Sequence, residues 1–108
     1  MSAELSGRRI AVIATDGFEE AELTEPRKAV TEAGATVDVV SIGPDPIQAM
    51  NGDIDKADTY EVQAVVSTAN AADYDALIMP GGTINADSLR VDADVRAFVT
   101  AFFDAGKP

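Results

Sequence analysis

Two apolar runs on either side of a helical pattern constrain the fold more than any other feature of this chain. Residues 10–14 (IAVIA) are wholly apolar, and residues 36–42 (TVDVVSI) alternate before they become apolar. Such runs indicate strands that are buried on both faces, as in a parallel sheet. Between them, residues 20–33 place apolar side chains near helical spacing, and Gly34 stands where a C-terminal cap belongs. Strand, helix and strand in this order predict a right-handed βαβ unit and an α/β fold.

The second half of the chain predicts one more core strand and two helices. Residues 76–79 (ALIM) indicate a third buried strand, which the Pro-Gly-Gly sequence at 80–82 ends. Residues 85–90 predict a short helix, and residues 92–105 predict an amphipathic one. The apolar side of that last helix is expected to be core, and it consists of Val95, Phe98, Val99, Phe102 and Phe103.

The segment between the second and third core strands is harder to interpret. Residues 47–51 (IQAMN) and 59–63 (TYEVQ) predict two short strands that form a side hairpin around Gly52 and Asp53. Residues 67–75 have the composition of a turn.

Three core strands leave one edge of the predicted sheet bare, which folded proteins normally avoid. The last helix ends at Gly106, and only Lys107 and Pro108 follow. Two interpretations fit: a small three-strand domain, or the first part of a larger one. We favour the second, with residues 1–108 as the N-terminal part of a single domain.

Charge and composition argue against several functions. The formal net charge is −11, with 19 acidic residues against 8 basic ones, whereas nucleic acid binding needs clustered Lys and Arg. No apolar run approaches the ~18 residues of a membrane helix. Residues 1–9 lack the apolar core of a signal peptide, so we expect a cytoplasmic protein without a membrane contact. The chain has no Cys and no His, hence no thiol nucleophile, imidazole base or usual zinc site.

An acidic turn follows the first strand and is the candidate site. Five carboxylates stand within ten positions, namely Asp16, Glu19, Glu20, Glu22 and Glu25. Ligands of open α/β sheets bind beyond the carboxyl ends of the strands, which is where this turn lies. The residues alone leave an alternative open: the acids could simply complement the dipole of the helix that begins here, at about 0.3–1 kcal/mol each.

Four motifs in sequence order resemble the ThiJ/PfpI superfamily. They are DGFEEAEL (16–23), IQAMNGDIDKADTYEV (47–62), DYDALIMPGGTINADSLR (73–90) and AFFDAGKP (101–108). The chain is most similar to the branch of PfpI-type intracellular proteases and general stress proteins. The resemblance implies a flavodoxin-like three-layer sandwich around a mostly parallel sheet, here without its C-terminal strands and helices. It also implies that the family's nucleophile elbow, a Cys followed by His, would come after Pro108.

The resemblance assigns roles to individual residues. Glu22 matches the acid that contacts the reactive Cys. An ionised carboxylate would disfavour a thiolate, so Glu22 can help only if it is buried enough to hold a proton and donate it in a hydrogen bond. Gly81 and Gly82 match the loop whose N–H groups form an oxyanion or anion site beside the Cys. Glu19 and Asp87 match acids with a secondary or intersubunit role. Without the resemblance, Pro-Gly-Gly would be read as a tight turn and the acids as helix-start residues.

The implied function is that of a stress-response protein which, in complete form, is a Cys-dependent enzyme. It would be an intracellular protease-like hydrolase, or a glyoxalase or deglycase, acting on small carbonyl compounds or peptides. The 108-residue chain alone is not expected to be catalytic. The resemblance implies no metal and no organic cofactor, no nucleic acid or membrane partner, and a homo-oligomer, either a dimer or a hexamer.

Other functions remain open because the site, rather than the fold, decides the activity. A non-catalytic redox sensor or a chaperone-like stress protein would fit the same fold. A class I glutamine amidotransferase domain would not explain residues 16–23. A receiver or flavin-binding module shares the architecture, but a receiver needs a phosphorylatable Asp at the end of the third strand, where this chain has Met79 and Pro80.

Overall fold

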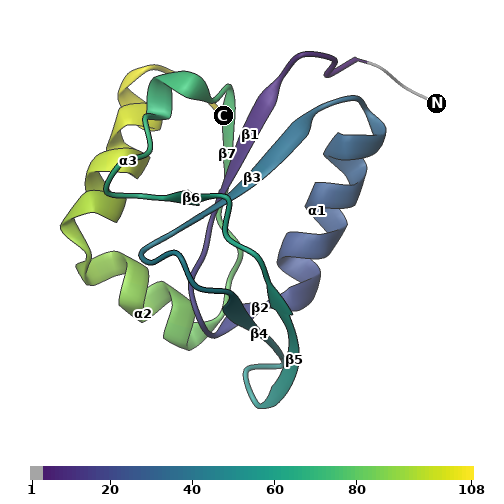
Figure 1. The fold of residues 1–108 in the computed structure, drawn as a ribbon, viewed down its shortest axis with the longest axis vertical. Coiled ribbons are helices and arrows are strands. Elements are labelled where there is room, and N and C mark those ends of the chain that lie inside the picture. Colours follow the sequence, from purple (N-terminus) through teal and green to yellow (C-terminus); the bar gives the residue numbers. More distant parts are fainter. Residues whose placement is uncertain (1–3) are drawn as a thin grey trace.

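A four-stranded parallel sheet forms the centre of the molecule, as seen in a computed structural model that describes residues 4–108 (Figure 1). The strand order is β6-β3-β1-β7, with β1 in the middle, and every neighbouring pair is parallel. The strands are β1 (Arg9–Ile13), β3 (Thr36–Ser41), β6 (Ala64–Val65) and β7 (Ala76–Ile78).

A small second sheet and the helices complete the fold. The second sheet has the order β2-β4-β5, in which β2 and β4 are parallel and β4 and β5 form an antiparallel hairpin. Its strands are β2 (Phe18–Glu19), β4 (Ile47–Asn51) and β5 (Asp55–Tyr60). The helices are α1 (Glu20–Glu32), α2 (Thr83–Val91) and α3 (Ala93–Asp104), with a 3-10 turn, η1 (Ala71–Asp73).

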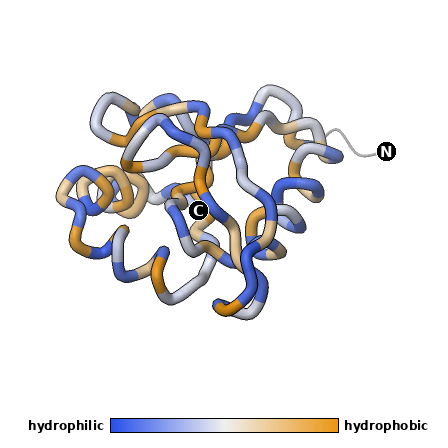
Figure 2. The backbone as a smooth tube through the Cα atoms, turned by 60° about the horizontal axis from the view of Figure 1, so that its bottom comes forward, coloured by the Kyte–Doolittle hydropathy of each residue, from blue (hydrophilic) through white to orange (hydrophobic). Residues whose placement is uncertain are grey.

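The central strand β1 divides the core into two apolar layers. Ala11 and Ile13 face a cluster built from η1, α2 and α3, whereas Val12 and Ala14 face Leu23 of α1 and the small sheet. Figure 1 shows α1 on one side of the sheet and α2 and α3 on the other, and Figure 2 shows helices that alternate between hydrophilic and hydrophobic residues. The predicted α/β fold with a mostly parallel sheet is therefore confirmed.

Element boundaries differ from the prediction in the middle of the chain. The sheet has a fourth strand, β6, which the sequence did not reveal because it is only two residues long. The second hairpin strand is β5 (Asp55–Tyr60) rather than residues 59–63. The hairpin closes tightly because Gly52 and Asp53 take left-handed φ angles of 67° and 63°, so the return strand begins early.

The edge strand β7 is less buried than predicted. It pairs only with β1 among the described strands, and its three residues are half-buried, while the next residue, Met79, is 61% exposed. In α3, Phe98 and Phe102 pack edge to face at 5.2 Å in the core, but Phe103 is 83% exposed, contrary to the prediction. At this edge the carbonyl of Pro108 accepts a hydrogen bond from the N–H of Leu77 at 2.9 Å.

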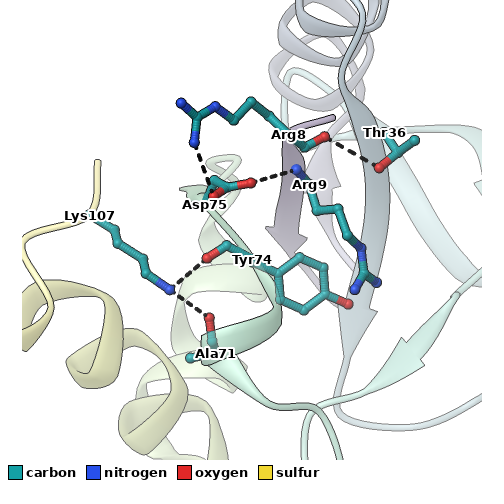
Figure 3. Close-up of polar contacts among 7 residues, drawn as sticks. All are labelled: Arg8, Arg9, Thr36, Ala71, Tyr74, Asp75 and Lys107. Carbon is teal, nitrogen blue, oxygen red and sulfur yellow. Dashed lines mark hydrogen bonds and ion pairs between the residues drawn. The ribbon is translucent and has the colours of Figure 1, made fainter. Parts of the chain in front are cut away.

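Polar contacts fasten the amino ends of the core strands, and Figure 3 shows those made by Asp75 and Lys107. Asp38 on β3 accepts from the guanidinium of Arg9 at 3.1 Å and from the hydroxyl of Tyr74 at 2.8 Å. Arg9 also lies 4.9 Å above the Tyr74 ring. Burial, followed by the contact with Asp38, raises the pKa of Tyr74 to about 12.

Two further contacts hold the same end of the sheet together. Asp75 accepts from the backbone N–H of Arg9 at 2.9 Å, and this bond lowers the pKa of Asp75. The ammonium group of Lys107 donates to the carbonyls of Ala71 and Tyr74 at 3.1 and 2.7 Å. All of these groups lie at the opposite end of β1 from the acidic turn, so they stabilise the fold away from the candidate site.

Candidate functional site

The candidate site lies beyond the carboxyl ends of β1 and β7. The loop after β1 leads through Asp16 and Gly17 into β2 and α1, and the loop after β7 leads through Pro80 and Gly81 into α2. The two loops are in contact, because the N–H of Glu19 donates to the carbonyl of Gly81 at 2.9 Å. The fold therefore brings together the two motifs that the sequence singled out.

Glu22 and Gly81 form the direct contact between these loops. The N–H of Gly81 donates to Oε1 of Glu22 at 2.6 Å. A Cβ at position 81 would lie 2.6 Å from the same oxygen, so any larger residue there would displace the Glu22 carboxylate from its present place. Glu22 lies in the first turn of α1 and is exposed, whereas the role implied by the resemblance requires a carboxyl that is buried enough to hold a proton.

Gly82 brings the two loops to van der Waals contact. It precedes α2 with a φ of 113°, and a Cβ on it would overlap the carbonyl oxygen of Gly17. Within residues 4–108 its N–H group makes no hydrogen bond. The N–H of Gly81, by contrast, is already bonded to Glu22. The oxyanion role of the loop stays a prediction.

Glu19 binds a different part of the molecule, the tip of the β4–β5 hairpin. Its two carboxylate oxygens accept from the N–H groups of Gly52 and Asp53 at 3.1 and 2.7 Å. The carboxylate of Asp53 in turn accepts from the N–H and the hydroxyl of Thr83 at 3.0 and 2.8 Å. Glu19 is thus linked through the hairpin tip to the first residue of α2.

Two further acids of the turn, Asp16 and Glu20, also make specific contacts. Asp16 accepts from the N–H of Gln48 at 2.8 Å. Glu20 accepts from the hydroxyl of Tyr60 at 2.8 Å and from the N–H of Asp58 at 3.3 Å. Burial, and then the bond to Glu20, raises the pKa of Tyr60 to about 12. The carboxylates therefore tie the start of α1 to distant segments, a role that the helix-dipole interpretation does not include.

Asp87 does not join the site. It lies on α2 with its side chain 64% exposed, and it pairs with Arg90, three residues later, at 3.3 Å. An acid on an exposed helix face can reach a neighbouring molecule, so its intersubunit role stays a prediction.

Asn85 is a site residue that the sequence interpretation missed. It is 1% exposed, and its Oδ1 accepts from the N–H of Thr15 at 2.8 Å. Its Nδ2 donates to the carbonyls of Pro80 and Gly81 at 2.9 and 3.4 Å. One signal was available: Asn85 stands four residues before Leu89, so the helical period places an amide on the core-facing side of α2.

Residues 4–108 contain neither a metal-binding cluster of side chains nor a helix that could cross a membrane. Within residues 4–108 no three Asp, Glu, Cys or His side chains come together in a way that could hold a metal ion. None of the helices in that range combines the length and the apolar character that a membrane crossing requires.

The sequence pattern of the DJ-1/PfpI family matches residues 8–108. General stress protein 18 of Bacillus subtilis (strain 168) is 38% identical over 104 residues, which cover 94% of this chain and 57% of that protein. A second protein of the same strain, YraA, named as a candidate cysteine protease, is 37% identical over 101 residues, with the same coverage. Protein/nucleic acid deglycase 2 of Escherichia coli (strain K12) is 32% identical over 101 residues, which cover 94% of this chain and 56% of that protein. The chain thus spans little more than half the length of these relatives.

Solved structures share the fold. A two-domain protein from Anabaena variabilis that contains DJ-1/ThiJ/PfpI-like and ferritin-like domains superimposes with a TM-score of 0.81. It is 21% identical in sequence, and the match covers 93% of this chain and 28% of that one. This likeness confirms the flavodoxin-like architecture.

Proposed function

Because this chain belongs to the DJ-1/PfpI family, we propose that its acidic turn is one half of a cysteine site in a stress-response protein. The other half would be a Cys–His turn supplied by polypeptide beyond Pro108. In this arrangement Glu22 tunes the thiol, and the loop of Gly81 and Gly82 offers a donor to a developing negative charge.

In complete form the protein would be a Cys-dependent hydrolase of the intracellular protease type, or a glyoxalase or deglycase. Its substrates would be peptides or small carbonyl compounds. The names of the relatives, one a candidate cysteine protease and one a deglycase, support both activities without separating them. We further propose a cytoplasmic homo-oligomer, a dimer or a hexamer, in which Asp87 faces a neighbouring subunit.

One observation carries the proposal: the N–H of Gly81 donates to Oε1 of Glu22 at 2.6 Å. Ionised and protonated carboxyl groups both accept such a bond, so the contact engages Oε1 and leaves Oε2 to face a thiol. The proposal requires that Oε2 carry a proton when the thiol is present. Oε2 then becomes the donor toward a thiolate or its oxidised form. The contact thereby gives the two oxygens of Glu22 different roles before any thiol arrives.

The experiment compares Glu22→Gln and Glu22→Ala in a polypeptide that includes the Cys–His turn. We expect Glu22→Ala to raise the thiol pKa by about one unit or more, since a hydrogen bond to a charged group contributes roughly 1.5–3 kcal/mol. Glu22→Gln keeps an acceptor for Gly81 and an N–H donor, so its effect should be smaller. Thiol pKa and rate of oxidation by peroxide are the readouts.

Glu25→Gln and Glu25→Ala are the matched controls, because Glu25 is an exposed acid of the same helix. They should leave thiol pKa and oxidation rate unchanged. If both Glu22 variants behave like their Glu25 counterparts, Glu22 has no role at the thiol.

A redox sensor or chaperone-like protein on the same fold is the second candidate. The hydrogen bond from Gly81 to Glu22 favours it. This bond leaves the loop with the N–H of Gly82 as its donor to an oxyanion, and an enzyme depends on such donors more than a sensor does. Assays of the longer polypeptide with methylglyoxal and with peptides separate the two functions. Turnover supports the enzyme, whereas clean, reversible thiol oxidation without turnover supports the sensor.

A further inference from the structure

The peptide group between Pro80 and Gly81 is held from both sides by side chains of distant segments. Its N–H donates to Oε1 of Glu22 at 2.6 Å, and its carbonyl accepts from Nδ2 of Asn85 at 2.9 Å. The described chain has no cis peptide bond, so the carbonyl and the N–H of this planar group point in opposite directions. Fixing the carbonyl direction therefore fixes the direction of the N–H.

Asn85 is suited to set that direction because its own amide cannot turn over. The N–H of Thr15, at 2.8 Å, requires an acceptor and so fixes Oδ1 on the β1 side. Nδ2 must then face the carbonyls of Pro80 and Gly81. The side chain is 1% exposed, so water does not compete for these bonds.

We infer that Asn85 is a positioning residue that acts on Glu22 through the Pro80–Gly81 peptide group. This inference rests on the proposed function, in which Glu22 is the working acid. The hydrogen bonds form one chain in which each bond polarises the next: the Asn85 amide, the peptide carbonyl, the peptide N–H and Glu22 Oε1. Asn85 thereby sets where Oε1 of Glu22 is held and, with it, where Oε2 points.

The test follows the Glu22 titration by NMR in the 108-residue chain itself. In the parent chain we expect the amide proton of Gly81 to shift with the same pH midpoint as the carboxyl carbon of Glu22. Asn85→Asp keeps an acceptor for Thr15 but, once ionised, cannot donate to Pro80. Asn85→Ala removes both contacts. In both variants the Gly81 amide proton should no longer shift at the pH midpoint of the Glu22 carboxyl carbon. The chemical-shift dispersion of the folded state should persist.

Asn70 supplies matched controls far from the site. Its Oδ1 accepts from the N–H of Ala72 at the start of η1, at 2.9 Å. Asn70→Asp and Asn70→Ala make the same chemical changes, and both should leave the midpoint shared by Gly81 and Glu22 in place. A loss of stability alone would not separate the two midpoints, so this readout distinguishes positioning from general support of the fold.

A measurement on the parent chain keeps the inference testable if the Asn85 variants unfold. The side-chain NH₂ resonances of Asn85 should follow the Glu22 midpoint through the polarised peptide group. The inference is overturned if folded Asn85 variants retain the pH midpoint shared by Gly81 and Glu22. It is also overturned if the side-chain NH₂ resonances of Asn85 do not shift as Glu22 titrates. No thiol takes part in this readout, so its result does not depend on the thiol experiment on Glu22, and each can fail separately.

Discussion

Gly82 shows how the absence of one side chain allows two loops to meet. Its φ of 113° lies in the left-handed region, and a Cβ would overlap the carbonyl oxygen of Gly17. Backbone strain and steric overlap therefore add at this position.

We expect Gly82→Ala to lower the free energy of unfolding by at least about 2 kcal/mol, from strain together with overpacking. Gly106→Ala is the control, since Gly106 also has a positive φ, 70°, but nothing lies within 4 Å of its would-be Cβ. In that variant the free energy of unfolding should fall only by the cost of a left-handed φ for alanine, about 1–2 kcal/mol. Urea unfolding of both variants measures the difference. Equal losses would show that the contact with Gly17 is unimportant.

The sequence identified Glu22 and Gly81 as site residues but not Asn85. Glu22 and Gly81 were singled out by motif and by place in the fold, and they are in direct contact. Asn85 was missed because its partners are backbone groups, one of them 70 residues away in sequence. Backbone donors and acceptors are the same at every position, so no sequence pattern marks them as partners.

Helix α2 owes its starting point to an element far away in the sequence. The sequence predicts a helix at 85–90, whereas α2 begins at Thr83. The cap comes from Asp53 at the hairpin tip, whose carboxylate binds the N–H and the hydroxyl of Thr83. A cap supplied from 30 residues upstream leaves no local signal, which is why the boundary could not be predicted.

Asp53→Ala should destabilise the fold by about 1–2 kcal/mol, because a cap is lost and alanine tolerates a left-handed φ poorly. Asp53→Asn should cost less, since Asn tolerates this conformation and keeps an acceptor oxygen. Amide hydrogen exchange in the first turn of α2 should accelerate most in the Ala variant. Asp55→Ala, at an exposed neighbour, should stay within about 0.5 kcal/mol of the parent. If Asp53→Ala matches that control, the hairpin does not stabilise α2.

At the scale of the whole molecule, two tyrosines join separate halves of the structure. Tyr60 connects the hairpin to the start of α1 through Glu20, and Tyr74 connects η1 to β3 through Asp38. Both have a pKa raised to about 12 from an ordinary value of 10.0, so both are neutral in the folded state well above pH 10.

Stability should therefore fall as pH rises from about 10 to about 12. In this window the unfolded chain has lost its tyrosine protons while the folded chain retains them, so rising pH favours unfolding. Urea unfolding at pH 9, 10 and 11 measures the slope. Tyr60→Phe and Tyr74→Phe should each reduce it, because Phe cannot ionise. An unchanged slope in the double variant would contradict this account.

The centre of the sheet was predictable because β1 and β3 come from largely apolar runs that are joined by one clear helical crossover. Strand β6 escaped prediction because two residues carry no periodicity, and its place is set by pairing with Val40 and Ser41 of β3. Strand β7 is half-buried because it lies at the edge of the sheet. The sequence predicted a bare edge, but the apolar run at 76–79 suggested a strand that is buried on both faces.

The peptide group between Pro80 and Gly81 has a consequence for how this site can evolve. Mutation replaces side chains, so it cannot delete the carbonyl of residue 80, and only proline at position 81 would remove the N–H. Apart from that proline, natural selection can alter the connection by changing Glu22 or Asn85, or by crowding it with a side chain at position 81, where a Cβ would meet Glu22 at 2.6 Å. Descendants that lose Asn85 should retain Glu22 under weaker selection, and the two positions should drift together.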